Sequence, residues 1–166
     1  MIALDLLLKG VLIGLAGTVA MDVLDIILNR LIARRRPDWG LVGRWVGHMP
    51  KIFHDGIAKA APVRGEAALG WSFHYGIGVF YGVVFAVLAG SDWFADPSFL
   101  PIWLFGLLTI SAGWFLLFPG MGLGWAMAKV GHPWRERAWG LLGHTVFATG
   151  MWACANLIGG SAGLAS

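Results

Sequence analysis

Long stretches without charged side chains constrain the fold of this chain more than any other feature. Asp, Glu, Lys and Arg are all missing from residues 67–91, 97–128 and 138–166. Each stretch exceeds the roughly 20 apolar residues that a helix needs to cross the hydrocarbon core of a bilayer. A fourth apolar region lies between Gly10 and Arg30, interrupted by two Asp residues. The sequence therefore predicts four transmembrane helices in a single integral membrane domain, near residues 8–31, 67–90, 100–128 and 138–160.

The composition also fits a surface that faces lipid. Charged residues make up 13% of the chain and hydrophobic residues 58%, whereas a soluble domain carries about 25% charged residues because its surface faces water. Ten Trp and ten Phe are available for aromatic belts at the lipid headgroups. The single Cys excludes an internal disulfide and a cysteine-rich metal site. We therefore expect an all-α polytopic membrane protein whose partner is the lipid bilayer.

Basic residues are distributed unevenly over the loops. In a four-span topology, the loops at about residues 30–66 and 129–137 lie on the same side, and they hold every Lys and Arg except Lys9. The loop on the other side, SDWFADP, has two Asp and no basic residue. Because cytoplasmic loops are enriched in Lys and Arg, we expect a multi-pass protein of the bacterial inner membrane with both termini in the periplasm. We expect no nucleic-acid partner, since the basic loops flank apolar spans.

The first basic loop is too long for a simple turn. Apolar residues recur at helical spacing over residues 41–49, with Arg44 and His48 on the opposite side. Pro50 interrupts this pattern, and apolar residues resume over residues 52–57. An amphipathic helix of this kind lies in the plane of the membrane surface. The pattern predicts two short helices on the cytoplasmic face, between the first and second spans.

Three of the predicted spans carry an ionisable side chain on a stripe of small residues spaced by four. The stripes are Gly10-Gly14-Thr18-Asp22, Glu66-Gly70-His74-Gly78-Gly82 and Gly140-His144-Ala148. Small residues at this spacing let membrane helices approach closely, within one chain or in a homo-oligomer. An ionisable side chain in a span is expected to point into the bundle, because facing lipid costs several kcal/mol.

The three ionisable side chains also lie at matching depths. Asp22, His74 and His144 are each seven or eight residues inside the cytoplasmic end of their span, which is roughly 10–12 Å at ~1.5 Å per residue. The third span reaches this depth near Met121, in a Pro-Gly-Met-Gly stretch that is expected to loosen or break the helix. We expect a shared site of Asp22, His74 and His144. The secondary candidates around it are Arg44, His48, His54, Glu66 and Met121.

Each candidate also has a purely structural interpretation. A lone histidine in a span is often a hydrogen-bonded packing residue. Asp22 can pair with His74 or Arg44 to join elements, and Met121 on a glycine-rich turn can simply fill a gap in the core. Histidines in the loops are usually solvated. The sequence alone leaves both interpretations open.

Five stretches of the sequence resemble a known family. They are GTVAMD, GRWVGHMPKIFHDGI, GEAALGWSFHYGIG, PGMGLG and GHTVFATGMW. Together they resemble a bacterial membrane family catalogued only as a domain of unknown function, and the resemblance runs from Gly17 to Trp152. It implies a four-helix inner-membrane protein. It implies no activity, cofactor or catalytic residue.

Three functions are compatible with these features. The first is a metal- or haem-binding protein, because imidazole suits transition metals and two histidines from different helices can ligate haem. The second is a small oligomeric transporter or proton-coupled carrier, because Asp and His inside a membrane can relay protons. The third is an accessory membrane protein without chemistry. No nucleophile elbow, phosphate loop, CxxC or HExxH motif occurs, so the sequence supports no particular enzyme.

The predicted orientation can be tested with topology reporters. Alkaline phosphatase fused after Ser166 is expected to be active, because this enzyme works only in the periplasm. The same reporter inserted after Lys129, in a basic loop, is expected to be inactive. The reverse pattern of activity would contradict the orientation.

Overall fold

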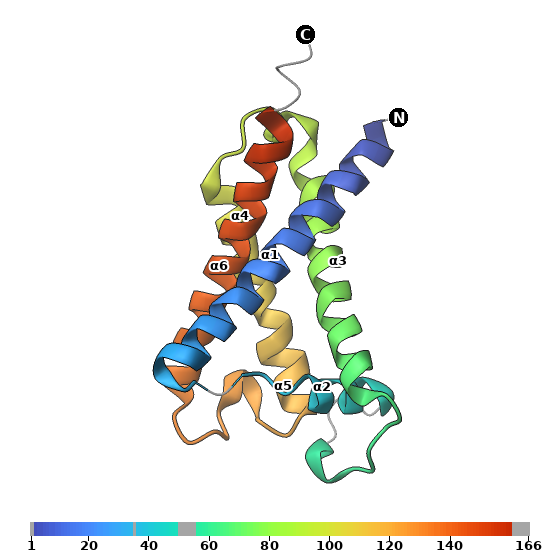
Figure 1. Cartoon of the computed structure of the whole chain (residues 1–166), viewed down its shortest axis with the longest axis vertical. Coiled ribbons are helices and arrows are strands. Elements are labelled where there is room, and N and C mark those ends of the chain that lie inside the picture. Colours follow the sequence, from blue (N-terminus) through green and yellow to red (C-terminus); the bar gives the residue numbers. More distant parts are fainter. Residues whose placement is uncertain (1, 35, 50–55, 161–166) are drawn as a thin grey trace.

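A computed structural model describes residues 2–34, 36–49 and 56–160. All regular secondary structure in these ranges is helical, and no strand forms there. The long helices are α1 (Ile2–Ile32), α3 (Glu66–Ala95), α4 (Phe99–Ala112) and α6 (Pro133–Gly160). The short elements are α2 (Trp39–Gly47), α5 (Phe118–Gly120), a π-helical turn at Gly113–Leu117, and 3₁₀ turns at Ile57–Lys59 and Trp125–Met127. The beginning of α1 and the end of α6 lie at one end of the molecule, and α2 lies at the other (Figure 1).

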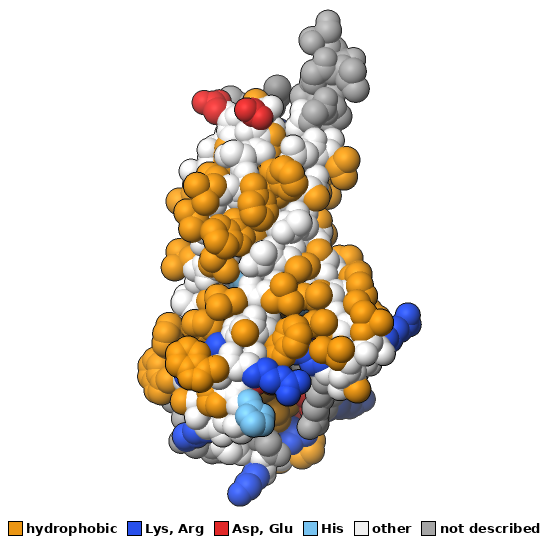
Figure 2. Space-filling view, turned by 90° about the vertical axis from the view of Figure 1, so that its left-hand side faces the viewer, with side chains coloured by type: hydrophobic (Ala, Val, Ile, Leu, Met, Phe, Trp, Pro, Cys, Tyr) orange, Lys and Arg blue, Asp and Glu red, His pale blue; other side chains and the backbone are white. Residues whose placement is uncertain are grey.

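Four helical segments are long and apolar enough to cross a membrane. They are Leu4–Ile32, Glu66–Ala95, Phe99–Gly120 and Pro133–Gly159. Large apolar side chains on their outer faces are open to the surroundings, such as Leu88 at 73% and Leu157 at 78% exposed. Hydrophobic side chains cover much of the face in Figure 2, and Lys and Arg gather at its lower end. These features confirm the predicted fold class, an all-α multi-pass membrane protein in contact with lipid.

The third span ends earlier than the sequence predicts. We expected it to extend to about residue 128, but continuous helix stops at Gly120. The ring of Pro119 is incompatible with the carbonyl one turn earlier in a regular α-helix, and the π-helical turn lies directly before it. After Pro119, Gly122 and Gly124 adopt φ angles of 80° and 77°, in the left-handed region that favours glycine. The Pro-Gly-Met-Gly stretch therefore breaks the helix, one of the two effects that the sequence predicts for it.

Helix α1 is the central helix, because it packs against α3 on one side and α6 on the other. On the α3 side, a Cβ atom added to Gly14 would lie 2.9 Å from Val79 Cα, and one added to Gly82 would lie 2.6 Å from Gly14 Cα. On the α6 side, a Cβ added to Gly150 would lie 3.0 Å from Gly17 Cα. Only glycine permits backbones to approach this closely. The glycine stripes predicted from the sequence therefore form contacts within the chain.

The remaining helices attach to this centre less evenly. Helix α4 packs on α6, whereas α3 makes limited contact with α4 and α6. Phe85 of α3 and Phe105 of α4 meet with ring centroids 5.3 Å apart. The most extensive contacts thus run in the order α3, α1, α6 and α4, and α3 meets α4 and α6 over a smaller area.

The first basic loop forms one of the two short helices predicted from the sequence. Asp38 caps α2, since its Oδ1 accepts a hydrogen bond from the Leu41 backbone N–H at 3.0 Å. Helix α2 packs across the start of α3, where Gly43 and Gly70 face each other so closely that a Cβ on either would overlap the other helix's backbone. The second short helix was predicted around residues 52–57, most of which lie outside the described residues.

The contact between α1 and α3 yields a stability prediction. A Cβ atom at Gly78 would overlap the hydroxyl of Thr18, which is 1% exposed. Gly78→Leu is therefore expected to lower the free energy of unfolding by about 1–3 kcal/mol, the usual cost of overfilling a packed contact. Thermal unfolding in detergent measures this change.

Gly76→Leu is the matched control on the same helix. A Cβ at Gly76 would meet no atom within 4 Å, so this variant is expected to unfold close to the unchanged protein. Equal stability of the two variants would contradict the close contact at Gly78.

Candidate functional site

The carboxylate of Asp22 lies at the centre of a polar cluster between α1 and α3. His74 Nε2 lies 3.0 Å from Asp22 Oδ1, and the Tyr75 hydroxyl donates a hydrogen bond to Asp22 Oδ2 at 2.8 Å. Each carboxylate oxygen therefore has a partner on α3. The side chains of His74 and Asp22 are 10% and 14% exposed.

The glycine contact explains why these three residues meet. Thr18 packs against Gly78, and its hydroxyl donates to the Gly14 carbonyl oxygen at 2.8 Å. One helical turn further along α1 comes Asp22, and one turn earlier on α3 comes His74. Because the two helices run in opposite directions, these two turns lie beside each other. The closeness of the backbones at Gly78 thus brings the carboxylate within hydrogen-bond distance of α3.

Aromatic rings cover this cluster on the side of α2. Trp39 stacks on His74, with ring centroids 4.0 Å apart and an interplanar angle of 27°. Trp71 lies one turn before Tyr75, 5.5 Å from Trp39 and 6.2 Å from Tyr75 between ring centroids. A shallow pocket of about 390 Å³ opens beside the two indoles. Its lining is Arg36, Pro37, Asp38, Trp39, Gly40 and Trp71.

Trp39 is held in place by an ion pair between α2 and α3. Arg44 donates to both oxygens of Glu66, from Nε at 2.8 Å and from Nη2 at 2.7 Å. These hydrogen bonds raise the pKa of the Arg44 guanidinium above its ordinary value, so the pair stays charged. His48 Nε2 lies 3.0 Å from the Ala61 carbonyl oxygen. Arg44 and Glu66 therefore fasten α2 to the start of α3, and His48 joins the end of α2 to the loop that precedes α3.

His144 bonds to a different helix from His74. Its Nδ1 lies 3.0 Å from the Gly106 carbonyl oxygen and 3.0 Å from the Thr109 hydroxyl, both on α4. A carbonyl oxygen only accepts, so Nδ1 carries the proton. His144 thus joins α6 to α4, whereas His74 joins α3 to α1.

The predicted shared site is therefore formed only in part. Asp22 and His74 come together, and His144 turns to α4. Met121 lies in the turn after α5, where its backbone N–H bonds to the Leu117 carbonyl oxygen at 2.9 Å. His54 lies outside the described residues. Across residues 2–34, 36–49 and 56–160, no group of three or more His, Cys, Asp or Glu side chains could hold a metal ion, so a metal or haem site is unsupported.

With this geometry established, the comparisons with known proteins place the chain in a family. The family described as "Protein of unknown function (DUF2938)" matches residues 11–158. The chain belongs to this family. No curated protein and no solved structure matches it. The match confirms the resemblance to a domain of unknown function and assigns no activity, so a function for this DUF2938 chain rests on its site.

A second polar cluster lies nearer the basic end of the DUF2938 chain. Arg34 Nη1 lies 2.9 Å from Asp25 Oδ1, and its Nη2 lies 3.9 Å from Glu136 Oε2. The same guanidinium lies 5.3 Å from the centre of the Trp139 ring. This cluster ties the loop after α1 to the beginning of α6. Sequence reasoning missed it, because Arg34 was interpreted only as part of a basic loop.

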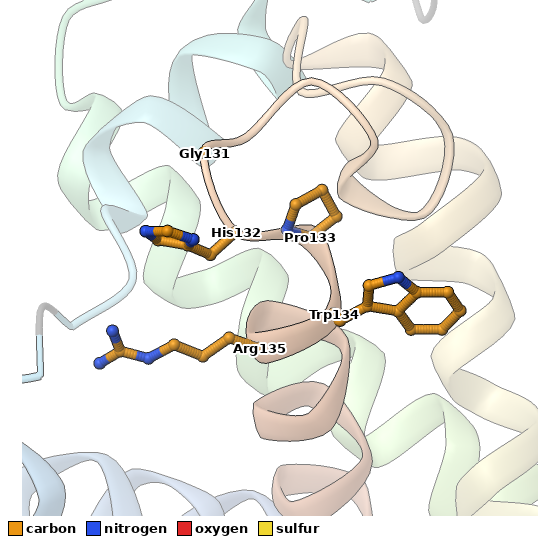
Figure 3. Close-up of a pocket in the computed structure, with 5 residues that line it drawn as sticks. All are labelled: Gly131, His132, Pro133, Trp134 and Arg135. Atoms are coloured by element: carbon orange, nitrogen blue, oxygen red, sulfur yellow. The ribbon is translucent and has the colours of Figure 1, made fainter.

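The beginning of α6 carries a hollow of about 510 Å³ lined by one continuous segment, residues 131–135. Figure 3 shows His132 and Arg135 pointing to the same side, away from Trp134. All three side chains are exposed, Trp134 at 79%. This hollow is a feature of the surface, and it contains none of the buried polar groups of the Asp22 cluster.

Three members of the cluster escaped prediction: Trp39, Trp71 and Tyr75. Tyr75 follows His74 directly, and neighbours on a helix project about 100° apart, so stripes spaced by four never include both. A carboxylate has two oxygens, however. A carboxylate that lies between His74 and Tyr75 therefore accepts a hydrogen bond from each of them. Trp39 belongs to the loop, where periodicity gives no information on which span it covers.

The position of His144 predicts that it affects stability. His144→Phe keeps a ring of similar size and removes the hydrogen bonds to α4. The Gly106 carbonyl keeps its bond from the Thr109 hydroxyl at 2.7 Å, so the expected loss is about 1 kcal/mol, the usual net value of one hydrogen bond. His132→Phe on the surface is the control, with an expected change within about 0.5 kcal/mol. Equal unfolding temperatures in detergent would show that His144 does not join the helices.

Proposed function

We propose that this chain is a small proton-coupled membrane carrier in which Asp22, His74 and Tyr75 form the proton-exchange site. The observation that carries the proposal is a carboxylate within a membrane-spanning helix whose two oxygens are hydrogen-bonded by an imidazole and a phenol from the next helix. Ionisable groups inside a span are costly and rare, and they mark proton relays and substrate paths.

The cluster can hold a proton without leaving a charge unpaired. With neutral imidazole, His74 donates from Nε2 to the Asp22 carboxylate. A further proton on Nδ1 creates an imidazolium beside that carboxylate, and the pair becomes neutral. Imidazole is the side chain suited to such exchange at physiological pH. Tyr75 donates to the other carboxylate oxygen in both states and keeps the carboxylate oriented.

The uneven extent of the helix contacts supports movement around this site. Helix α3 is attached to α1 and makes limited contact with α4 and α6. Rocking of one group of helices against another is the usual way in which carriers alternate access. Because four spans are few for a carrier, the proposal includes a homo-oligomer in the bacterial inner membrane. It also includes the orientation with both basic loops in the cytoplasm, so that the Asp22 cluster exchanges protons with that side.

The stacking of Trp39 on His74 provides a direct test of proton exchange. An imidazolium quenches the fluorescence of an adjacent indole more strongly than neutral imidazole does. The difference in fluorescence between the unchanged protein and Trp39→Phe reports on this one indole among the ten. This difference is measured from about pH 4 to 10, and we expect a single step in it, with weaker Trp39 emission at the acidic side.

Matched histidine variants identify the group that titrates. His74→Gln is expected to remove the step, and His144→Gln is expected to leave it unchanged. The proposal fails if Trp39 shows no step over this range, or if the step persists in His74→Gln.

A further inference from the structure

We propose that the substrate exchanged for the proton is an organic cation, which takes the place of the His74 proton as the positive partner of Asp22. This inference rests on the proposed proton-exchange function and names the class of substrate. Three observations carry it: the aromatic rings around the carboxylate, the balance of the surrounding charges, and the pocket beside the indoles.

The walls of the cluster are aromatic. Between ring centroids, Trp71 lies 5.5 Å from Trp39 and 6.2 Å from Tyr75. It also lies 5.9 Å from the His74 ring. The face of an aromatic ring attracts a cation within about 6 Å, and rings of this kind recognise alkylammonium groups. Metal ions such as Mg²⁺ and Ca²⁺ instead require several oxygen ligands. Rings around one carboxylate therefore suit an organic cation.

The charges around Asp22 leave its carboxylate dependent on one exchangeable positive charge. On α1 and α6, Asp25 and Glu136 share Arg34, and Arg36 adds a further positive charge near Asp25. Across α2 and α3, Arg44 is paired with Glu66. These groups compensate one another in charge. Asp22 is hydrogen-bonded to His74 and Tyr75, and of these only His74 can become positive.

Exchange at Asp22 then conserves charge. The cation brings one positive charge to the carboxylate, and His74 releases one proton to the water at the basic end. No bond other than the one to this proton breaks. Proton and cation therefore compete for one position, and each lowers the affinity of the other by the same factor.

The pocket provides the way in. It is lined by Trp39 and Trp71, with Arg36 and Asp38 beside them. Arg36 is exposed, so salt screens its charge. Asp38, two residues further along the chain, also lines the pocket. A cation that settles on the indoles reaches Asp22 when Trp39 leaves the His74 ring. Trp39 thus covers the site when no cation is bound.

Two probes of matched size and opposite charge test the class of substrate. Tetraphenylphosphonium and tetraphenylborate are titrated calorimetrically into the full-length protein in neutral detergent. We expect tetraphenylphosphonium to bind with an affinity that rises with pH, by up to tenfold per pH unit. We also expect the release of up to one proton per cation, measured in buffers of different ionisation enthalpy. Tetraphenylborate is expected not to bind.

Variants locate the site of binding. Asp22→Asn is expected to lose binding, whereas Asp96→Asn, at the exposed far end of α3, keeps it. Trp39→Ala and Trp71→Ala are expected to weaken binding at least tenfold, and Trp134→Ala, on the exposed beginning of α6, to leave it unchanged. The tryptophan variants keep the test decisive if Asp22→Asn does not fold.

The alternative outcomes overturn different statements. Binding of tetraphenylborate alone would mean that Arg36 selects anions. Equal binding of both probes, or binding independent of Asp22, would mean adsorption to apolar surface, and no binding of either would remove the class of substrate altogether. Each of these results overturns the assignment of an organic cation as the substrate. If the fluorescence step from His74 persists, the proton-exchange function still stands. Loss of that step in the unchanged protein overturns the carrier itself.

Discussion

The approach of two backbones at Gly14 and Gly78 determines the rest of this structure. In a bilayer the hydrophobic effect does not drive helices together, because lipid tails are as apolar as the helix surface. Association instead requires close packing and hydrogen bonds, and glycines permit both here. Thr18 fills the space beside Gly78, and the next turn of α1 carries Asp22 to α3. A wider contact would leave the carboxylate out of reach of His74.

Histidine serves two of the helix contacts in different ways. His144 donates to a backbone carbonyl of α4, a partner that has no charge and cannot exchange a proton. His74 instead faces a carboxylate and stacks on an indole that borders a pocket. The same side chain at the same depth is thus a fixed connection in one place and an exchangeable group in the other. The difference lies in the partner that each helix offers.

Much of the fold could be predicted from the sequence, because lipid imposes simple rules. Charge-free stretches gave the spans, and small residues spaced by four gave the faces of α1 and α3 that meet, including the pairing of Asp22 with His74. The direction of His144 could not be predicted. Gly143 faces Met21 of α1 while its neighbour His144 faces α4, so α6 has partners on two sides. Periodicity defines a face without identifying which helix it meets.

The central position of α1 has a consequence for how the protein is made. Helix α1 is synthesised before both of the helices on which it packs, α3 and α6. Before α3 is inserted, Asp22 lacks its two partners, His74 and Tyr75. A carboxyl group without partners in lipid is less costly when it is neutral. Insertion of α3 supplies His74 and Tyr75, and only the arrival of α6 closes the face around Gly17. A chain truncated before α6 therefore leaves one face of α1 uncovered.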